Sequence, residues 1–533
     1  MTNAIILAAG KSEQFAPFTY EKPKGLFRVK GEILIERQIE QLQEAGVKEI
    51  YIVIGYMKEK FFFLEQKYGV RLLVNNKYDK KGNLYSLFLA KEYLRDTFIC
   101  CADHYFKKNP FLNKNEFNYS YRDCAFQTGQ FREFAVTYSD ADVITSVEIG
   151  GTNQIAMVGH AYFNKRFSDV FTALMENEIN DFGVSDLFWE EFYARHQKEL
   201  TLYINLCKEE DILEFESIED LRRFDSEFLL NVDSEIITNI CSVLKCNPND
   251  IVNIQVIQQG LTNVSFKFKV HGMTYVYRHP GGTAGSLINR QTELYAQNMA
   301  KQLGVDKSVI YMHPSGWKIS YFVENLIECN FEKYPGQLEK AFEYLRDIHA
   351  VKVDTTLVKN FDTVSEAQKL MKIACSTKGN LFSEFSDIVK KIQELDEYVK
   401  KDAVSLKTGR VMCHNDTYTP NYLATEKGEL YLIDWEYAGI NDPANDLACI
   451  LCRDNYTSEQ TERYLKVYFG RELTADEHRH YIAYIAISGF YWFCWGLYKG
   501  SVGDDDGFFF LPAYRNCVRY IDIALNSYKN DSN

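Results

Sequence analysis

The stretch His414-Asn415-Asp416-Thr417-Tyr418-Thr419-Pro420-Asn421, followed by Ile433-Asp434-Trp435-Glu436, decides the fold of the second half of this 533-residue chain. Phosphoryl transfer to a hydroxyl requires a carboxylate near that hydroxyl and oxygen ligands for a metal ion on the phosphates. Asp416 is placed to orient or deprotonate the hydroxyl, and Asn421 and Asp434 are placed to hold Mg²⁺. The alternative is a polar loop before a strand with a capping Asp, but three elements in the required order disfavour it. The stretch predicts a phosphotransferase.

Four further segments precede this stretch, and their order matters more than any one of them. They are Gly260-Leu261-Thr262-Asn263-Val264-Ser265, Tyr275-Val276-Tyr277-Arg278-His279-Pro280-Gly281, Ile288-Asn289-Arg290-Gln291-Thr292-Glu293 and Trp317-Lys318-Ile319-Ser320-Tyr321-Phe322-Val323-Glu324. Together they resemble the choline/ethanolamine kinase and aminoglycoside phosphotransferase group over about residues 235–530, and look closest to bacterial choline kinases. The resemblance implies an α+β, protein-kinase-like domain of two lobes that uses ATP.

The resemblance also implies roles for single residues of these segments. The implied nucleotide-binding residues are Thr262, Asn263, Ser265, Arg278 and Glu293. The first three belong to a phosphate-binding loop, and Arg278 stands where protein kinases carry their phosphate-binding Lys. Glu293 is expected to pair with Arg278, and the segment around Trp317 is expected to reach the hinge between the lobes and the adenine.

A charge-free run of 18 residues, Tyr481–Tyr498, predicts a buried helix rather than a membrane span, because aromatic residues fill its centre. Trp492 and Trp495 are three residues apart and share a helix face. A quaternary ammonium is recognised by aromatic faces, so the resemblance implies that this pair lines a choline pocket, with Tyr437 and Glu436 completing it. The alternatives are core packing of both rings, or an aminoglycoside site, which would be lined with carboxylates.

The first ~225 residues alternate strand and helix patterns, which predicts a mostly parallel sheet with helices on both faces. The strand-like runs are Ala4–Ala8, Glu49–Gly55, Val70–Val74 and Thr97–Ala102, and helical patterns fit residues 35–46 and 84–94. Ligands of such sheets lie beyond the carboxyl ends of the strands, where Gly10 and Asp103 stand. We therefore expect an α/β, Rossmann-like domain over residues 1–228, followed by the kinase-like domain over 229–533.

Leu7-Ala8-Ala9-Gly10, then Pro17, then Lys22-Pro23-Lys24 resembles the sugar-nucleotide and phosphocholine nucleotidyltransferases. The segments Ile35-Glu36-Arg37-Gln38-Ile39-Glu40 and Val53-Ile54-Gly55-Tyr56-Met57-Lys58-Glu59 favour the phosphocholine branch. The resemblance implies that Gly10 and Lys11 bind the nucleotide, that Lys24 contacts the phosphates, and that Asp103 and Glu216 hold the metal ion. Asn83 and Ser86 are candidates for nucleotide contacts. Phe134 and Asp186, with Trp189 nearby, are candidates for the trimethylammonium site.

The phosphate-binding loop departs from the family pattern at three positions. The second Gly of that pattern is Ser12 here, the Arg is Gln14, and Glu13 adds a negative charge where a triphosphate should lie. Glu216 also stands where an Asp is usual, which Mg²⁺ tolerates. Two functions therefore stay open. Either the chain makes phosphocholine from choline and ATP and then CDP-choline from CTP, or it is a choline or ethanolamine kinase whose inactive N-terminal domain binds a nucleotide and regulates.

Composition excludes several other classes of protein. The chain has 60 Lys and Arg against 74 Asp and Glu, and a net charge of −14 disfavours nucleic acid and anionic membrane surfaces as partners. Thirteen scattered cysteines without a signal peptide predict reduced thiols in the cytoplasm, with no stable membrane insertion. The sequence leaves open whether the chain forms a homo-oligomer, which amino alcohol it uses, and whether an intermediate is channelled between the domains.

Overall fold

Strand β1 (Asn3–Ala8), buried along its whole length, lies inside a seven-stranded sheet in the computed structural model of the chain. The structure describes residues 2–112, 119–257, 263–281, 287–379, 385–406, 408–502 and 510–530. The order of the sheet is β10-β8-β9-β6-β1-β4-β5. β1 pairs in parallel with β4 (Ile50–Ile54) and β6 (Thr97–Cys101), and β4 pairs in parallel with β5 (Arg71–Val74). These four strands are the ones that the apolar runs predict.

Two long strands, which no sequence pattern predicted, complete the sheet. β8 (Tyr121–Tyr138) and β9 (Ile144–Phe163) form an antiparallel pair with several register shifts, and β9 also runs antiparallel to β6. β10 (Tyr203–Leu206) pairs in parallel with β8. The four parallel pairings confirm a mostly parallel sheet, but its longest pairing is antiparallel.

Helices cover both faces of this sheet because alternate residues of β1 point to opposite sides. Ile5 and Leu7 pack into a core with α3, α4 and α5, whereas Ala4 and Ile6 pack into a second core with α1 and α2. The helices here are α1 (Leu34–Glu44), α2 (Phe63–Tyr68), α3 (Asn83–Leu89), α4 (Lys165–Glu178), α5 (Trp189–Arg195), α6 (Ile218–Phe224), α7 (Phe228–Asn231) and α8 (Glu235–Leu244). Short strands are β2 (Arg28–Val29), β3 (Glu32–Ile33), β7 (His104–Phe106) and β11 (Ile212–Glu214).

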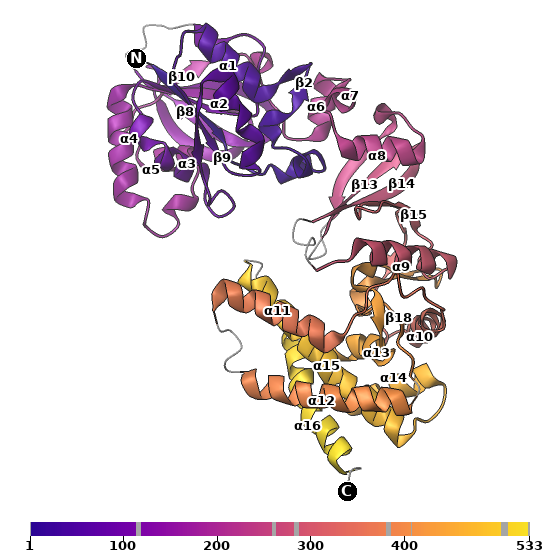
Figure 1. Cartoon of the computed structure of the whole chain (residues 1–533). Coiled ribbons are helices and arrows are strands. Elements are labelled where there is room, and N and C mark those ends of the chain that lie inside the picture. Colours follow the sequence, from indigo (N-terminus) through magenta and orange to yellow (C-terminus); the bar gives the residue numbers. More distant parts are fainter. Residues whose placement is uncertain are drawn as a thin grey trace. The chain divides into compact units, whose positions relative to one another are not determined.

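A five-stranded sheet of order β12-β13-β14-β16-β15 begins the second half of the chain (Figure 1). Its strands are β12 (Val252–Ile257), β13 (Asn263–Val270), β14 (Met273–Pro280), β15 (Val309–Met312) and β16 (Lys318–Tyr321), accompanied by α9 (Arg290–Gln302). Short strands follow, namely β17 (Leu326–Ile327), β18 (Val411–Cys413), β19 (Tyr422–Thr425), β20 (Leu430–Leu432) and β21 (Gly439–Asn441). The larger helices are α10 (Pro335–His349), α11 (Thr363–Lys378), α12 (Ser386–Ser405), α13 (Ala444–Cys452), α14 (Ser458–Phe469), α15 (Ala475–Ser501) and α16 (Leu511–Asn530). This order of a β-rich part and a helical part is that of a kinase-like domain.

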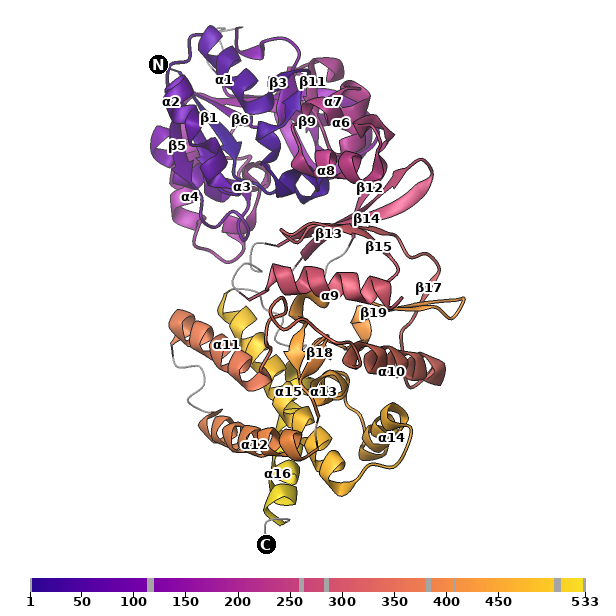
Figure 2. The ribbon, with the colours of Figure 1, turned by 45° about the vertical axis from the view of Figure 1, so that its right-hand side comes forward.

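Helix α15, 27 residues long, is the centre of the helical core (Figure 2). α16 packs closely against it: a Cβ on Gly489 would come within 2.7 Å of the Ala513 carbonyl oxygen. The charge-free run Tyr481–Tyr498 is therefore a buried helix, as predicted. No helix in the described part of the chain combines the length and apolar character needed to cross a bilayer.

The chain divides into two compact units. Unit 1 comprises Met1–Val256 with Phe268–His271, and unit 2 comprises Ile257–Lys267 with Gly272–Asn533.

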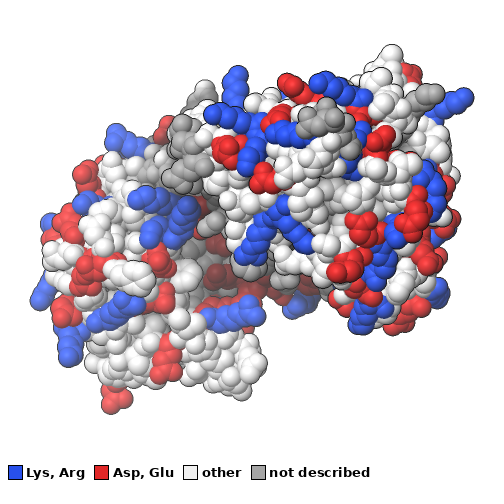
Figure 3. Space-filling view, turned by 90° about the horizontal axis from the view of Figure 1, so that it is seen from below, with Lys and Arg blue, Asp and Glu red and all other residues white. Residues whose placement is uncertain are grey.

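Acidic and basic side chains are interspersed on the face shown in Figure 3, so the net charge of −14 is not gathered there into one acidic area. All thirteen cysteines lie among the described residues and are free thiols, as predicted.

Candidate active sites

Asp416 lies in the loop after β18 and is 7% exposed. Asn421 donates from Nδ2 to the Asp416 backbone oxygen at 2.7 Å and to its carboxylate at 3.0 Å. Burial raises the pKa of Asp416, while Arg453 and His414 partly offset this effect. The Asn421 amide nitrogen is thus committed to Asp416, which leaves the amide oxygen for a cation.

Asp446 in α13 holds the loop that carries Asp416. Its carboxylate accepts hydrogen bonds from the backbone N–H groups of His414 at 3.0 Å and Asn415 at 2.6 Å. His349 contacts the same carboxylate at 3.0 Å. Asp446 is fully buried and its carboxylate is engaged by these three partners, so it fixes the backbone on which Asp416 is presented.

A buried cluster of opposite charges surrounds Asp434, which follows β20 with a φ of +67°. Arg278 contacts Asp434 at 3.2 Å and also pairs with Glu293, as the sequence predicted. Glu436 accepts from the Asn263 amide at 2.6 Å and lies 3.5 Å from Arg278. About a third of the Asp434 side chain stays exposed, so this oxygen donor is accessible to a metal ion.

The predicted aromatic pair lies close to these carboxylates. The rings of Trp492 and Trp495 are 6.0 Å apart, and Trp495 donates from Nε1 to the Tyr437 hydroxyl at 2.9 Å. Tyr437 meets Trp492 edge to face at 5.5 Å. One face of Trp492, however, is covered by Arg453, whose guanidinium carbon lies 3.2 Å from the ring centre. The three predicted aromatic residues are therefore brought together, in contact with an arginine that the sequence did not indicate.

In unit 1, Lys24 and Asp103 form a buried ion pair at the carboxyl end of the sheet. Lys24 Nζ donates to the Asp103 carboxylate at 2.8 Å and to the Phe215 carbonyl at 2.7 Å. Burial opposes ionisation of Asp103, but Lys24 and His104 outweigh it and lower its pKa to about 2. Asp103 is consequently an ionised oxygen donor, and the Lys24 ammonium lies next to it.

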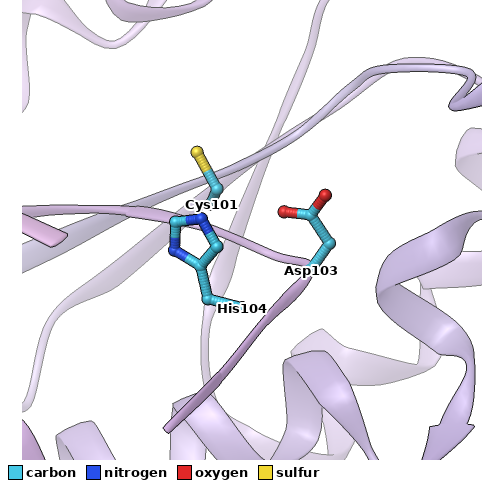
Figure 4. Close-up of side chains that lie close together, drawn as sticks. All are labelled: Cys101, Asp103 and His104. Atoms are coloured by element: carbon cyan, nitrogen blue, oxygen red, sulfur yellow. The ribbon is translucent and has the colours of Figure 1, made fainter. Parts of the chain in front are cut away.

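Two further side chains stand beside Asp103 (Figure 4). The ligand atoms of Cys101, Asp103 and His104 all lie within 4.8 Å of one another. His104 Nε2 lies 3.1 Å from the Glu214 carboxylate, which raises the pKa of His104 against the effect of burial. Burial raises the pKa of the Cys101 thiol well above its usual range, so this thiol is not ionised. Asp103 is therefore the only anionic side chain of these three.

Glu216 is exposed and interacts with a second carboxyl group. A hydrogen bond with Glu133 of β8, together with burial, raises the pKa of Glu216 to about 7. Two carboxyl groups this close share a proton or a cation. Glu216 thus has the environment of an acidic ligand pair, of which the sequence indicated one member.

The loop after β1 has a left-handed backbone conformation at the position of the missing glycine. Ser12 has a φ of +50°, in the left-handed region that favours glycine. Lys11, a predicted nucleotide-binding residue, pairs with Glu13 at 2.7 Å, and both side chains are largely exposed. Gln14 is exposed as well.

The remaining predicted residues of unit 1 have internal partners. Asn83 accepts from the Trp189 backbone at 2.7 Å, and Ser86 accepts from the Asn75 amide at 3.0 Å. Trp189 is 2% exposed and belongs to the core. Lys81 pairs with Asp186 at 2.7 Å. Phe134 packs against Phe188, two residues from Asp186, so these two candidates lie near each other.

Known families match both halves of the chain. The choline/ethanolamine kinase family matches residues 254–487, and the MobA-like NTP transferase domain matches residues 4–130. The choline-phosphate cytidylyltransferase of Streptococcus pneumoniae is 33% identical over 232 residues, which are 43% of this chain and 98% of that protein. The chain is a member of the cytidylyltransferase family fused to a choline/ethanolamine kinase domain.

Two further relatives bear on this cytidylyltransferase–kinase fusion. A 2-aminoethylphosphonate cytidylyltransferase of Lancefieldella rimae is 34% identical over 240 residues, 43% of this chain and 94% of that protein. Protein LicA of Haemophilus influenzae is 25% identical over 261 residues, 46% of this chain and 93% of that protein.

Sequence reasoning missed several residues of both sites in the fusion. Arg453 pairs with Asp416, Asp446 holds the loop that carries Asp416, and His104, which pairs with Glu214, lies beside Asp103; each is an ordinary polar residue in the sequence. Only the position of His104, directly after Asp103, could have drawn attention to it. Ser265 lies half-buried in β13, whereas Thr262 and the residues before it in the predicted phosphate loop of the kinase domain lie outside the described residues.

Proposed function

We propose that the chain makes phosphocholine from choline and ATP in its kinase domain, and then CDP-choline from phosphocholine and CTP in its cytidylyltransferase domain. The observation that carries the first reaction is the buried Asp416, whose carboxylate accepts a hydrogen bond from Asn421 and pairs with Arg453. Asp446 holds the loop before it through the backbone N–H groups of His414 and Asn415. The second reaction is supported by the relative of 33% identity and by the Lys24–Asp103 pair.

In the first reaction the choline hydroxyl oxygen attacks the γ-phosphorus of ATP. The bond between that phosphorus and the ADP oxygen breaks, and the hydroxyl proton goes to Asp416. Asn421 and Asp434 fit a divalent cation, for which we propose Mg²⁺, because both offer oxygen donors; the ion supplies charge neutralisation on the phosphates. Arg278 is the cationic side chain closest to Asp434 and is positioned to contact a phosphate.

In the second reaction a phosphate oxygen of phosphocholine attacks the α-phosphorus of CTP, and pyrophosphate leaves. No proton has to be transferred, so the side chains bind and orient. Asp103 and Glu216 offer carboxylates for a divalent cation, and Lys24 offers the positive charge for the phosphates.

A second candidate function follows from the loop after β1. Lys11 forms an ion pair with Glu13, and Lys24 forms one with Asp103. Gln14 stands where the family pattern has an arginine. A domain with these features could bind a nucleotide and regulate the kinase without transferring anything. The relative named for 2-aminoethylphosphonate supports that compound as an alternative acceptor of the transfer reaction.

The test is ³¹P NMR of the full-length chain with choline, ATP, CTP and Mg²⁺, which resolves phosphocholine, CDP-choline and pyrophosphate. We expect Asp416→Asn to slow phosphocholine formation by about 10²–10⁴ while CDP-choline still forms from added phosphocholine. Asp103→Asn should give the opposite pattern, so each variant controls for the folding of the other.

Failure of the wild-type chain to release pyrophosphate with phosphocholine, phosphoethanolamine or 2-aminoethylphosphonate would favour the regulatory function of the N-terminal domain. Failure to phosphorylate choline or ethanolamine would contradict the proposed kinase substrate.

A further inference from the structure

Arg453 occupies the space between two aromatic rings beside Asp416. Its guanidinium carbon lies 3.2 Å from the ring centre of Trp492 and 4.1 Å from that of Tyr418. Its Nη1 lies 3.0 Å from the Asp416 carboxylate, and the side chain is 11% exposed. The chain therefore places its own cation against an aromatic face and against the carboxylate proposed as the base.

The proposed acceptor would use the same two groups. A quaternary ammonium has no N–H donor and is bound by aromatic faces, and its hydroxyl must approach Asp416 to react. One ring face cannot hold two cations at van der Waals distance, and two positive charges side by side repel each other. Arg453 thus contacts both groups that choline would need, the Trp492 ring and the Asp416 carboxylate.

We propose that Arg453 is an internal competitor for the cationic acceptor: it fills the aromatic site in the free enzyme and must swing out when the acceptor binds. This inference rests on the proposed function of the kinase domain and specifies what sets its acceptor affinity. The apparent affinity of a ligand falls by the fraction of protein in which its site is open. Arg453 accordingly makes the kinase respond only to a high concentration of acceptor.

The position of Arg453 in the fold allows this movement. It is the C-cap residue of α13, and its long side chain has several rotatable bonds, so the guanidinium can leave Trp492 by side-chain rotation alone. Its Nε–H is buried and has no hydrogen-bond partner among the described residues.

Asp416 does not lose all its partners when Arg453 leaves. Asn421 still donates to the other carboxylate oxygen at 3.0 Å, and the incoming cation restores the compensating charge nearby. The exchange of one cation for another keeps the buried carboxylate paired in both states.

The first experiment compares choline and ATP kinetics of Arg453→Met with those of the wild type. Met keeps an unbranched side chain but has no charge, so we expect the choline KM to fall about tenfold and the ATP KM to stay the same. Arg463→Met is the matched control, because Arg463 lies 5.4 Å from the Tyr464 ring and pairs with Glu332 on an exposed part of the same unit. It should change neither constant.

A second experiment uses guanidinium chloride at millimolar concentration as the probe. In Arg453→Ala the free guanidinium ion should refill the space and inhibit competitively against choline, whereas the wild type should be much less sensitive. Arg453→Lys serves if the other variants do not fold, because it keeps the ion pair and loses the planar stack, which should lower the choline KM by a smaller factor.

A choline KM that rises or stays constant in all three variants would overturn the inference and leave the proposed function standing. A wild-type enzyme that phosphorylates no amino alcohol would instead contradict the proposed function itself. The two failures are therefore distinguishable in one set of assays.

Discussion

Ser12 stands where the transferase loop usually has a glycine, and its backbone is left-handed. Its φ of +50° lies in a region that costs an ordinary side chain about 1 kcal/mol, yet the chain keeps that turn. The charges next to Ser12 are less favourable for binding a triphosphate, because Glu13 neutralises Lys11. Their ion pair is exposed and contributes at most about 1 kcal/mol. A pair this weak can open when a triphosphate arrives.

We therefore predict that Glu13→Gln lowers the CTP KM of CDP-choline formation several-fold, and that Lys11→Ala raises it about tenfold. The measurement is pyrophosphate release by the full-length chain over a range of CTP concentrations. Asp169→Asn is a suitable control, because Asp169 forms an equally exposed pair with Lys165 on α4. If Lys11→Ala leaves the CTP KM where it is, the loop does not contact the triphosphate.

Single residues also mark the limit of what the sequence could predict. Asp416, Asn421 and Asp434 were found because the chemistry fixes their types and order. No motif in the sequence identifies Arg453, which directly follows the apolar helix α13. Only the packing of α13 against α15 brings it onto Trp492. The roles of the predicted residues remain predictions, while their proximity is established.

At the scale of elements, the strands with continuous apolar runs were predicted and the longest pair was not. β8 and β9 each have a continuous buried run only near one end, at residues 121–125 and 156–161, and much of the rest is exposed or half-buried. They also contain glycines and polar residues, so no local pattern identifies them as strands. Their pairing is long-range information that a local pattern does not contain. Helix α1, by contrast, runs from Leu34 to Glu44, close to the predicted residues 35–46, because an apolar pattern of helical period specifies it locally.

The start of α15 yields a prediction about stability. Thr474 and Glu477 form a capping box, and Arg471 holds the Glu477 carboxylate at 2.7 Å. The hydrogen bond from Arg471 lowers the pKa of Glu477 to about 2. A depressed folded-state pKa means that the stabilisation is present above the unfolded value of about 4.3 and is lost as the pH falls towards 2.

Glu477→Ala should therefore lower the free energy of unfolding by about 1 kcal/mol at neutral pH, and this difference should narrow below about pH 5. Urea unfolding followed by tryptophan fluorescence measures it, since four of the five tryptophans lie in unit 2. The matched control is Gln460→Ala, which breaks the equivalent box of α14 around a residue that does not titrate. Parallel pH dependence of both variants would show that the Glu477 charge contributes nothing.

In the whole molecule, the described residues of each proposed site belong to a single unit. Lys24, Asp103 and Glu216 lie in unit 1, whereas Asp416, Asn421 and Asp434 lie in unit 2. Each unit also has its own hydrophobic cores, so a substitution in one site should leave the other fold intact. A chain with two such sites needs only diffusion of phosphocholine to couple its reactions.

We therefore predict that two inactive chains complement each other. A mixture of full-length Asp416→Asn and Asp103→Asn should make CDP-choline from choline, ATP and CTP, although neither variant alone should. Formation should begin after a lag, because phosphocholine has to accumulate in solution before the second chain can use it. Alkaline phosphatase added to the mixture should abolish the product by destroying that free intermediate, and in the wild-type chain the same addition measures how much phosphocholine escapes. A mixture that makes phosphocholine but no CDP-choline, while wild-type chain makes both, would mean that the two sites must belong to one molecule and that diffusion is insufficient.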